Sequence, residues 1–241
     1  MIDPKDENST RWARGMGDRP ILFSLASGKY WLSKRTDNVI ANMGFDSIAK
    51  FGDIKVYQNK YALPFGFTYN KIIRAKDFKK LSPVQKDLAI LRACVIEDEE
   101  LEKFKDFKLF NLKDTLAPNT FESYLQYTNE LKKDRFQITK FSENNIVGMI
   151  HSNDTKLLFF SFPYDEGWNA KVNGKDSQLF KLNCGLTGMK IGKGTNKVNI
   201  SFTPRYQHLG SIVSIGSFIL FIIILISKVV ITNKKGIEKS E

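Results

Sequence analysis

The sequence is poor in the residues from which small catalytic and metal sites are built. It contains two cysteines and two histidines among 241 residues. Neither Cys94 nor Cys184 has a second thiol near it in the sequence, which excludes a dense disulfide scaffold and a Cys-x-x-Cys metal site. His151 and His208 alone offer little material for a histidine-based triad or metal site. The sequence also lacks Gly-x-Ser-x-Gly, P-loop and His-Glu-x-x-His motifs, so it indicates no catalytic residue, metal or cofactor.

The two cysteines leave two alternatives open. A single long-range disulfide between Cys94 and Cys184 is compatible with a location outside the cell. Two buried free thiols are equally compatible with the sequence, because unpaired cysteine is among the residues most often buried.

Acidic residues are outnumbered by basic ones, and the first residues lack an apolar run. The chain carries 37 Lys+Arg against 26 Asp+Glu, a formal net charge of +11. Such a surface favours polyanions, although a solvated lysine-rich surface needs no partner. Without zinc-finger spacing, an RNP-type motif or a basic heptad region, we expect no nucleic-acid partner. The N-terminal segment, residues 1–20, is polar and does not resemble a secretory signal peptide.

The long apolar run lies near the C-terminus. Residues 209–227 read LGSIVSIGSFILFIIILIS and contain no charged residue. At about 1.5 Å per residue a helix of this length spans roughly the 30 Å of bilayer hydrocarbon, and core helices seldom keep every face apolar for so long. We therefore predict a transmembrane helix followed by a basic tail, residues 228–241. Within about twenty residues of the run, four Lys or Arg precede it and four follow it, so the positive-inside rule gives no orientation.

Small residues recur along the predicted membrane helix. Gly210, Ser214 and Ser217 stand at i, i+4 and i+7 and so lie on one face. Small side chains let a neighbouring helix approach closely. The stripe therefore predicts packing against another membrane helix, and the alternative is that it faces lipid.

Residues 21–134 are typical of a mixed α/β region. Residues 21–69 are rich in β-branched and aromatic residues broken by turns, which predicts short strands. Further on, EDEELEKFKDFK is predicted to be a solvated connector, and NTFESYLQYTNELKKD a helix capped by Asn119 with Glu122 reaching back.

The clearest soluble helix is predicted in SPVQKDLAILRACVI. Ser82 can cap it, Pro83 takes the first helical position and Gln85 completes a capping box. Helical spacing predicts one buried stripe, formed by Val84, Leu88, Leu91 and Val95.

From residue 135 to residue 204 the pattern changes to period two. Seven short runs, divided by Gly, Asn, Asp and Pro, predict an antiparallel β-sandwich: RFQITKF, NIVGMIHS, KLLFFSF, WNAKVNG, SQLFKLN, LTGMKIG and NKVNISFTP. Asn173-Gly174 indicates a type I′ hairpin, because both central residues of that turn need positive φ. The predicted fold is thus α+β and mostly β, a mixed region followed by a sandwich and one C-terminal transmembrane helix. Since only residues 205–208 separate the last two, we expect the sandwich to lie against the lipid headgroups.

Aromatic residues gather around an acidic turn at residues 159–175, FFSFPYDEGWNAKVNGK. Tyr164 and Trp168 are candidates for a stacking platform that binds a sugar ring. The alternative for Trp168 is a plug in the sandwich core. Asp165 and Glu166 form an acidic pair, but neighbouring side chains in a turn diverge, so we interpret them as a surface turn and not as paired glycosidase carboxylates.

These same residues carry a family resemblance. LLFFSFPYDEGWNAKVNGK and the later KLNCGLTGMKIGKGTNKVNISFTPRYQHLGSIVS closely resemble the C-terminal end of the bacterial YfhO family of membrane proteins. A second segment, VYQNKYALPFGFTY, is similar to another family pattern at Val56, Tyr57, Asn59, Ala62, Leu63, Pro64 and Gly66. Together the matches cover most of the chain from about residue 21 onward.

The resemblance implies a large multi-pass protein of the GT-C glycosyltransferase type. Such proteins are linked to the transfer of sugars from polyprenyl-phosphate donors to lipoteichoic acid or related polymers outside the cell. This chain lacks the multi-helix portion and its catalytic loop, as a truncated or split gene would. The resemblance therefore assigns no catalytic residue and leaves open whether the chain is part of an enzyme.

The same resemblance implies a location and partners. The soluble part would lie outside the cytoplasm and the lysine-rich tail inside it. Membrane lipid, the transmembrane helices of the missing portion and an anionic cell-envelope polymer would be the partners. The alternative function is a stand-alone, membrane-anchored module that binds carbohydrate or teichoic acid.

Overall fold

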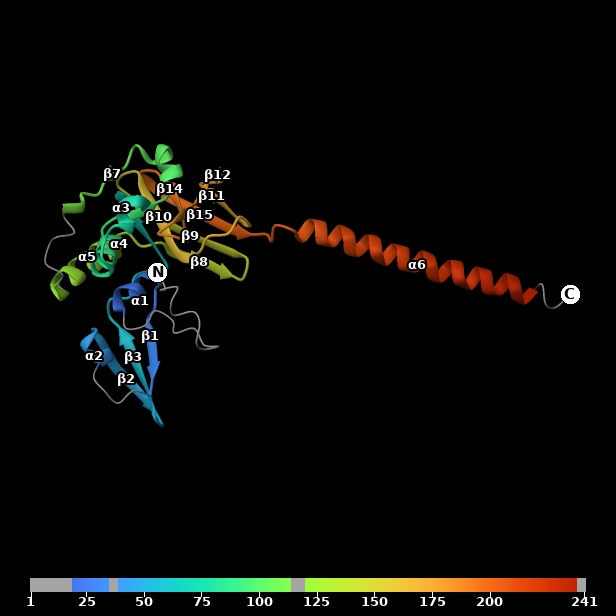
Figure 1. Ribbon diagram of the computed structural model, residues 1–241, viewed down its shortest axis with the longest axis horizontal. Helices are drawn as coiled ribbons and strands as arrows, with labels where there is room; N and C mark the ends of the chain where they lie inside the picture. The colour runs from blue at the N-terminus through green and yellow to red at the C-terminus, as the bar shows by residue number, and fades with distance from the viewer. Residues whose placement is uncertain (1–18, 35–38, 114–119, 238–241) are drawn as a thin grey trace. The chain divides into compact units, whose positions relative to one another are not determined.

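The computed structural model describes residues 19–34, 39–113 and 120–237 of the chain (Figure 1). It divides into two compact units, Met1–Ser201 and Phe202–Glu241. The predicted polar segment 1–20 therefore lies almost wholly outside the described residues, as does the proposed cap Asn119.

A small antiparallel sheet forms near the start of the first unit, in the order β1-β3-β2. Its strands are β1 (Tyr30–Ser33), β2 (Phe45–Phe51) and β3 (Ile54–Asn59). The short helix α2 (Val39–Asn42) contributes the fully buried Ile40, which shares a core with Phe45 and Tyr57. This sheet thus has its own apolar core on one face.

A seven-stranded sheet is the centre of the first unit, in the order β4-β10-β14-β13-β6-β5-β7. Its strands are β4 (Gly66–Tyr69), β5 (Lys71–Arg74), β6 (Cys94–Ile96), β7 (Lys108–Leu109), β10 (Lys156–Pro163), β13 (Leu179–Leu182) and β14 (Leu186–Ile191). β5 pairs in parallel with β6 and β7, whereas β4, β10, β14 and β13 pair antiparallel. The sheet therefore takes strands from both sides of the predicted division after Asp134.

A five-stranded sheet has the order β12-β11-β15-β9-β8. Its strands are β8 (Gln137–Ser142), β9 (Asn145–Ser152), β11 (Trp168–Val172), β12 (Lys175–Ser177) and β15 (Gly194–Phe202). Every one of the seven predicted runs thus contains a strand, and β12 is an addition. The prediction of an α+β, mostly β fold is confirmed.

The strand β10 is buried on both faces. Leu158 and Phe160, both 0% exposed, belong to the core between the two large sheets, together with Ile146, Ile150, Ala170, Leu179, Met189, Ile191, Val198 and Ile200. Leu157 and Phe159, also 0% exposed, point into the core on the other side of the seven-stranded sheet. This explains why the aromatic residues of β10 do not alternate with polar ones.

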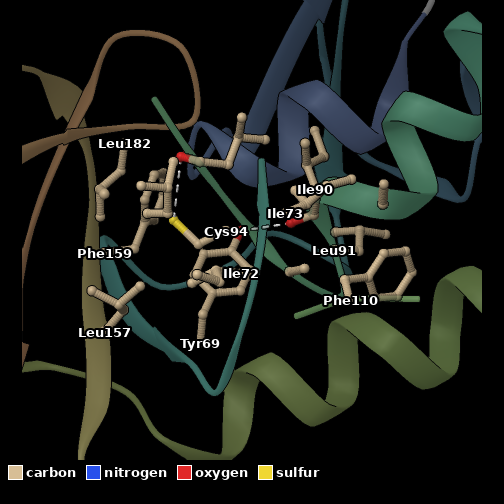
Figure 2. Packing of buried hydrophobic residues seen from close by; sticks show 14 of the residues in the cluster. Tyr69, Ile72, Ile73, Ile90, Leu91, Cys94, Phe110, Leu157, Phe159 and Leu182 are labelled. Carbon is tan, nitrogen blue, oxygen red and sulfur yellow. Dashed lines mark hydrogen bonds between the residues drawn. The ribbon is translucent and has the colours of Figure 1, made fainter. Parts of the chain in front are cut away.

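Helices cover that other face and complete the larger core, part of which is drawn in Figure 2. They are α1 (Pro20–Leu25), α3 (Ala75–Lys79), α4 (Pro83–Ile90), the 3-10 helix η2 (Asp98–Phe104) and α5 (Phe121–Lys133). Tyr69 lies among these side chains and donates its phenol hydrogen to the carbonyl of Ile90 at 2.6 Å. The buried hydroxyl therefore has a partner and ties β4 to the end of α4.

Two predictions for the N-terminal half were wrong. Residues 20–25 form the helix α1 where strands were expected, because Pro20 starts a helical turn and Leu25 packs into the larger core. The charged segment after β6 is not a solvated connector, since Phe104 is 1% and Phe107 8% exposed. Two phenylalanines at helical spacing anchor it to the core despite its charge.

The capping box of α4 is confirmed, but its predicted buried stripe is only half right. Gln85 N donates to Ser82 Oγ at 3.4 Å, and Ser82 N donates to the Gln85 side chain at 2.9 Å. Leu88 and Leu91 are buried, whereas Val84 is 51% exposed. The helix ends at Ile90, so the buried Val95 belongs to β6 instead.

Turn chemistry elsewhere agrees with the sequence. Asn173 and Gly174 have φ of 52° and 82° and join β11 to β12 through the pair Val172↔Lys175, which confirms the two-residue hairpin. The predicted helix after residue 119 is α5, and its cap is Thr120, whose hydroxyl accepts from Ser123 N at 3.2 Å.

The second unit contains the helix α6, Gln207–Ile237. Within Gln207–Lys228, an 18-residue window has a mean hydropathy of 2.8, and none of this window is buried. Among the described residues this is the helix long and apolar enough to cross a membrane. It contains the predicted span 209–227, and the helix continues into the predicted tail as far as Ile237.

Candidate functional site

The acidic turn joins β10 to β11 and is stabilised by its own backbone. Gly167 N donates to Asp165 Oδ1 at 2.7 Å, and Trp168 N donates to Asp165 O at 3.2 Å. Asp165 therefore accepts from the two residues that follow the bend, as aspartates in tight turns do. Asp165 and Glu166 are both exposed, in agreement with the expected surface turn.

Tyr164 and Trp168 lie on the two sides of this turn. Both are half-buried and pack against the core between the two large sheets. The Trp168 ring centroid lies 4.8 Å from that of Phe162. A half-buried indole can fill the edge of a core and still present part of its surface, so the sugar-binding role of these two residues stays a prediction.

A polar cavity of about 360 Å³ lies elsewhere in the first unit, beside β4 and α5. Its walls come from four separate stretches of sequence, and they are Thr68, Tyr69, Asn70, Lys71, Leu91, Arg92, Gln126, Tyr127, Glu130, Leu131, Asp134 and Lys156. The cavity is thus lined by cationic and anionic side chains, by amide side chains and by tyrosine hydroxyls. This composition suits a hydroxylated or anionic ligand better than an apolar one.

An ion pair builds one wall of the cavity. Lys156 Nζ contacts Asp134 Oδ2, which also accepts from Thr68 Oγ1 at 3.1 Å. The Lys156 and Asp134 side chains are 20% and 32% exposed, so the pair is partly screened from water. The carboxylate bonds to both partners, which fixes its position at the end of α5.

Aromatic rings hold Arg92, another residue that lines the cavity. The Arg92 guanidinium lies 4.7 Å from the Tyr127 ring centroid and 4.9 Å from that of Phe110. Such stacking fixes the orientation of a guanidinium against the faces of the rings. Arg92, Lys71 and Lys156 give the cavity three cationic side chains against two carboxylates.

Sequence reasoning missed this cavity. Tyr127 and Glu130 are three positions apart on α5, but the cationic residues of the lining come from β5, from the segment after α4 and from β10. No local motif links these segments, because their proximity depends on the pairing of β4 with β10.

The described residues contain no group of three or more His, Cys, Asp or Glu that could hold a metal ion. His151 Nδ1 lies 3.3 Å from Thr195 Oγ1 on the sandwich surface. Both cysteines are free thiols; Cys94 is buried and Cys184 exposed. The cysteines thus form neither the disulfide nor the pair of buried thiols that the sequence left open. Burial raises the pKa of the Cys94 thiol.

The small-residue stripe of α6 is open. A Cβ added at Gly210 would meet nothing within 4 Å, and Ser217 uses its hydroxyl to donate to Val213 O at 2.8 Å. The Ser217 hydroxyl is therefore satisfied within its own helix. Packing of the stripe against another helix stays a prediction.

Comparison with known proteins agrees with the family resemblance. The family model described as "Bacterial membrane protein YfhO" matches residues 2–120 and 110–214. The chain is 20% identical to the "Uncharacterized protein YfhO" of Bacillus subtilis (strain 168) over 323 aligned positions, which cover 91% of this chain and 37% of that protein. The chain thus spans about a third of the length of this relative, and no solved structure matches it significantly. With a family match along most of its length and an apolar helix after the sandwich, the chain belongs to the YfhO family of bacterial membrane proteins.

Proposed function

We propose that the chain is the extracytoplasmic module and last membrane helix of a YfhO-family glycosyltransferase. The reaction would transfer sugars from polyprenyl-phosphate donors to lipoteichoic acid or a related cell-envelope polymer. Family membership along most of the chain carries this proposal. The bulk of the chain lies outside the membrane on the extracytoplasmic side in this proposal, and the lysine-rich tail lies in the cytoplasm.

The module contributes binding and not bond chemistry. The lining of the polar cavity has one more cationic side chain than carboxylates, which favours an anionic or hydroxylated polymer, and the net charge of +11 attracts polyanions over a longer range. Reactive groups would come from other membrane helices of the complete enzyme.

The helix α6 joins the module to those helices. Gly210, Ser214 and Ser217 give it a face that another helix can approach closely. In this proposal the stripe packs against the transmembrane helices of the catalytic portion, and the rest of α6 faces lipid.

Polymer binding is the test of the cavity. The full chain in lipid nanodiscs is titrated with lipoteichoic acid, and Lys71→Glu is compared with Lys193→Glu, which lies in the exposed turn between β14 and β15. Both variants change the net charge equally, so a loss of affinity confined to Lys71→Glu supports the cavity. Equal losses would show that only overall charge matters.

A sugar-transfer assay tests whether the chain is catalytic on its own. We expect the purified chain, given a polyprenyl-phosphate-linked sugar and lipoteichoic acid, to transfer no sugar. Measurable turnover by the chain alone would contradict the proposal.

The partly exposed position of Trp168 favours a second candidate, a stand-alone membrane-anchored module that binds carbohydrate or teichoic acid. It predicts that Trp168→Ala abolishes the binding of sugars while the unfolding midpoint stays unchanged. If the same substitution unfolds the domain, Trp168 is a core residue and this candidate loses its support.

A further inference from the structure

Four aromatic rings form a continuous row at one edge of the sandwich. Phe141 contacts Phe65, with ring centroids 5.9 Å apart; Phe65 stacks on Phe162 at 5.6 Å, and Phe162 contacts Trp168 at 4.8 Å. We call these four residues the aromatic ridge. Phe141 is 64% exposed and the other three are half-buried. Phe65, Phe162 and Trp168 also pack against the core between the two large sheets, so the row presents part of its aromatic surface to the outside.

One end of the ridge lies where the chain leaves the sandwich. Strand β15 ends at Phe202, and its residue Ser201 pairs with Asn145 at the start of β9. Asn145 in turn pairs with Ser142, the neighbour of Phe141 on β8. Phe141 therefore lies two strands from β15, at the end of the sheet where β15 finishes.

The chain itself limits how far this end can lie from the bilayer. Helix α6 starts at Gln207, five peptide steps after Phe202, and five extended residues span at most about 18 Å. The apolar run of α6 starts two residues later, at Leu209. With α6 across the membrane, the end of β15 must stay within about 21 Å of the interface, which is the connection of about 18 Å plus about 3 Å of helix.

We propose that the aromatic ridge lies in the headgroup region of the phospholipid bilayer. Aromatic side chains concentrate at membrane interfaces because their rings suit the boundary between hydrocarbon and water. Tyr206 adds another exposed aromatic ring in the connection to α6, with 66% of its surface exposed. The ridge thus acts as an interfacial anchor that complements the membrane span.

The charges beside the ridge argue for a general phospholipid contact and not for recognition of anionic headgroups. Asp165 and Glu166 precede Trp168, whereas Lys140 precedes Phe141, so both signs are present. Zwitterionic phosphatidylcholine therefore suffices as the partner. The proposal rests on α6 crossing the bilayer and does not depend on sugar transfer.

A fluorophore placed on the ridge tests this contact in the full chain. Cys184→Ser removes the exposed thiol and leaves the buried Cys94 unlabelled. Phe141→Cys then carries a nitrobenzoxadiazole label, and Phe51→Cys is the matched control, since Phe51 is a strand phenylalanine exposed to 69% in the small sheet. Both proteins are reconstituted in phosphatidylcholine nanodiscs with or without brominated acyl chains.

We expect brominated lipid to quench the label at position 141 and to leave the label at position 51 bright. The label at 141 should also emit further to the blue and be shielded from iodide. Equal quenching at both positions, or iodide access at 141 equal to that at 51, would overturn the proposal. Shielding from iodide without quenching by brominated lipid would also overturn it, because a protein would then cover the ridge.

A second label position guards against damage to the ridge itself. Glu143→Cys, in the exposed turn that follows β8 and two residues after Phe141, keeps all four rings. It should also be quenched by brominated lipid, and a label at 143 that stays bright while far-UV circular dichroism is unchanged would refute the contact.

Discussion

The burial of β10 on both faces predicts that two adjacent phenylalanines stabilise the fold equally. Phe159 faces the core under the helices, and Phe160 faces the core between the two large sheets; both are 0% exposed. If the five-stranded sheet did not cover this face, Phe160 would be a surface residue and its removal would cost little. Substitution of Phe160 by alanine therefore tests the sandwich itself.

The expected loss follows from the contacts of the ring. Burial of a phenylalanine side chain contributes about 1.5–3 kcal/mol by transfer from water, and the unfilled cavity raises the cost of Phe→Ala to about 3–5 kcal/mol. The Phe160 ring also contacts Phe136 edge-on, with centroids 5.2 Å apart, and Phe65 at 6.0 Å. We expect Phe160→Ala and Phe159→Ala each to lower the free energy of unfolding by an amount in this range.

Denaturant unfolding of the full chain in detergent micelles measures both variants, with tryptophan fluorescence as the signal. Phe141→Ala is the control, because Phe141 is 64% exposed, and we expect it to cost less than about 1 kcal/mol. A loss for Phe160→Ala no larger than that of the control would refute the packing of the two sheets. A large loss for Phe160→Ala and none for Phe159→Ala would refute the core under the helices.

Two further predictions concern titrating side chains. Cys184 is exposed and Cys94 is buried, so a thiol reagent should modify Cys184 in the native protein and Cys94 only after unfolding. Mass spectrometry measures both modifications, and Cys94 modified under native conditions would contradict its burial. Burial raises the pKa of Tyr124 from 10.0 to about 12. Between these pH values the folded chain keeps a proton that the unfolded chain loses, so the free energy of unfolding should fall as the pH rises. Tyr124→Phe should reduce that fall, as measured by urea unfolding across this pH range, and an unchanged pH dependence would show that Tyr124 does not cause it.

The second half of the fold could be predicted from the sequence because its signals are local. Alternation of side chains and turn residues such as Asn173 and Gly174 depend on near neighbours, and each predicted run contains a strand. The capping box at Ser82 is equally local. Such patterns retain their meaning whatever packs around them.

The first half could not be predicted as well, because its structure is set by distant contacts. The apolar run 20–25 fits a strand or a helix by composition, and only its packing in the larger core decides. The parallel pair Ile72↔Cys94 has no turn signal, since parallel strands are joined by long connections. The polar cavity also depends on contacts between distant segments, such as the pairing of β4 with β10, so no local sequence motif predicts it.

The pairing of β4 with β10 has a consequence for the time at which the protein can fold. Residue Phe67 faces Phe159 across these strands, and everything between them must be synthesised before the pair can form. At about 5–20 residues per second the ribosome needs roughly 5–20 s for this stretch. During that interval the apolar side chains of the larger core stay exposed, so the unfinished chain should need chaperones to prevent its aggregation.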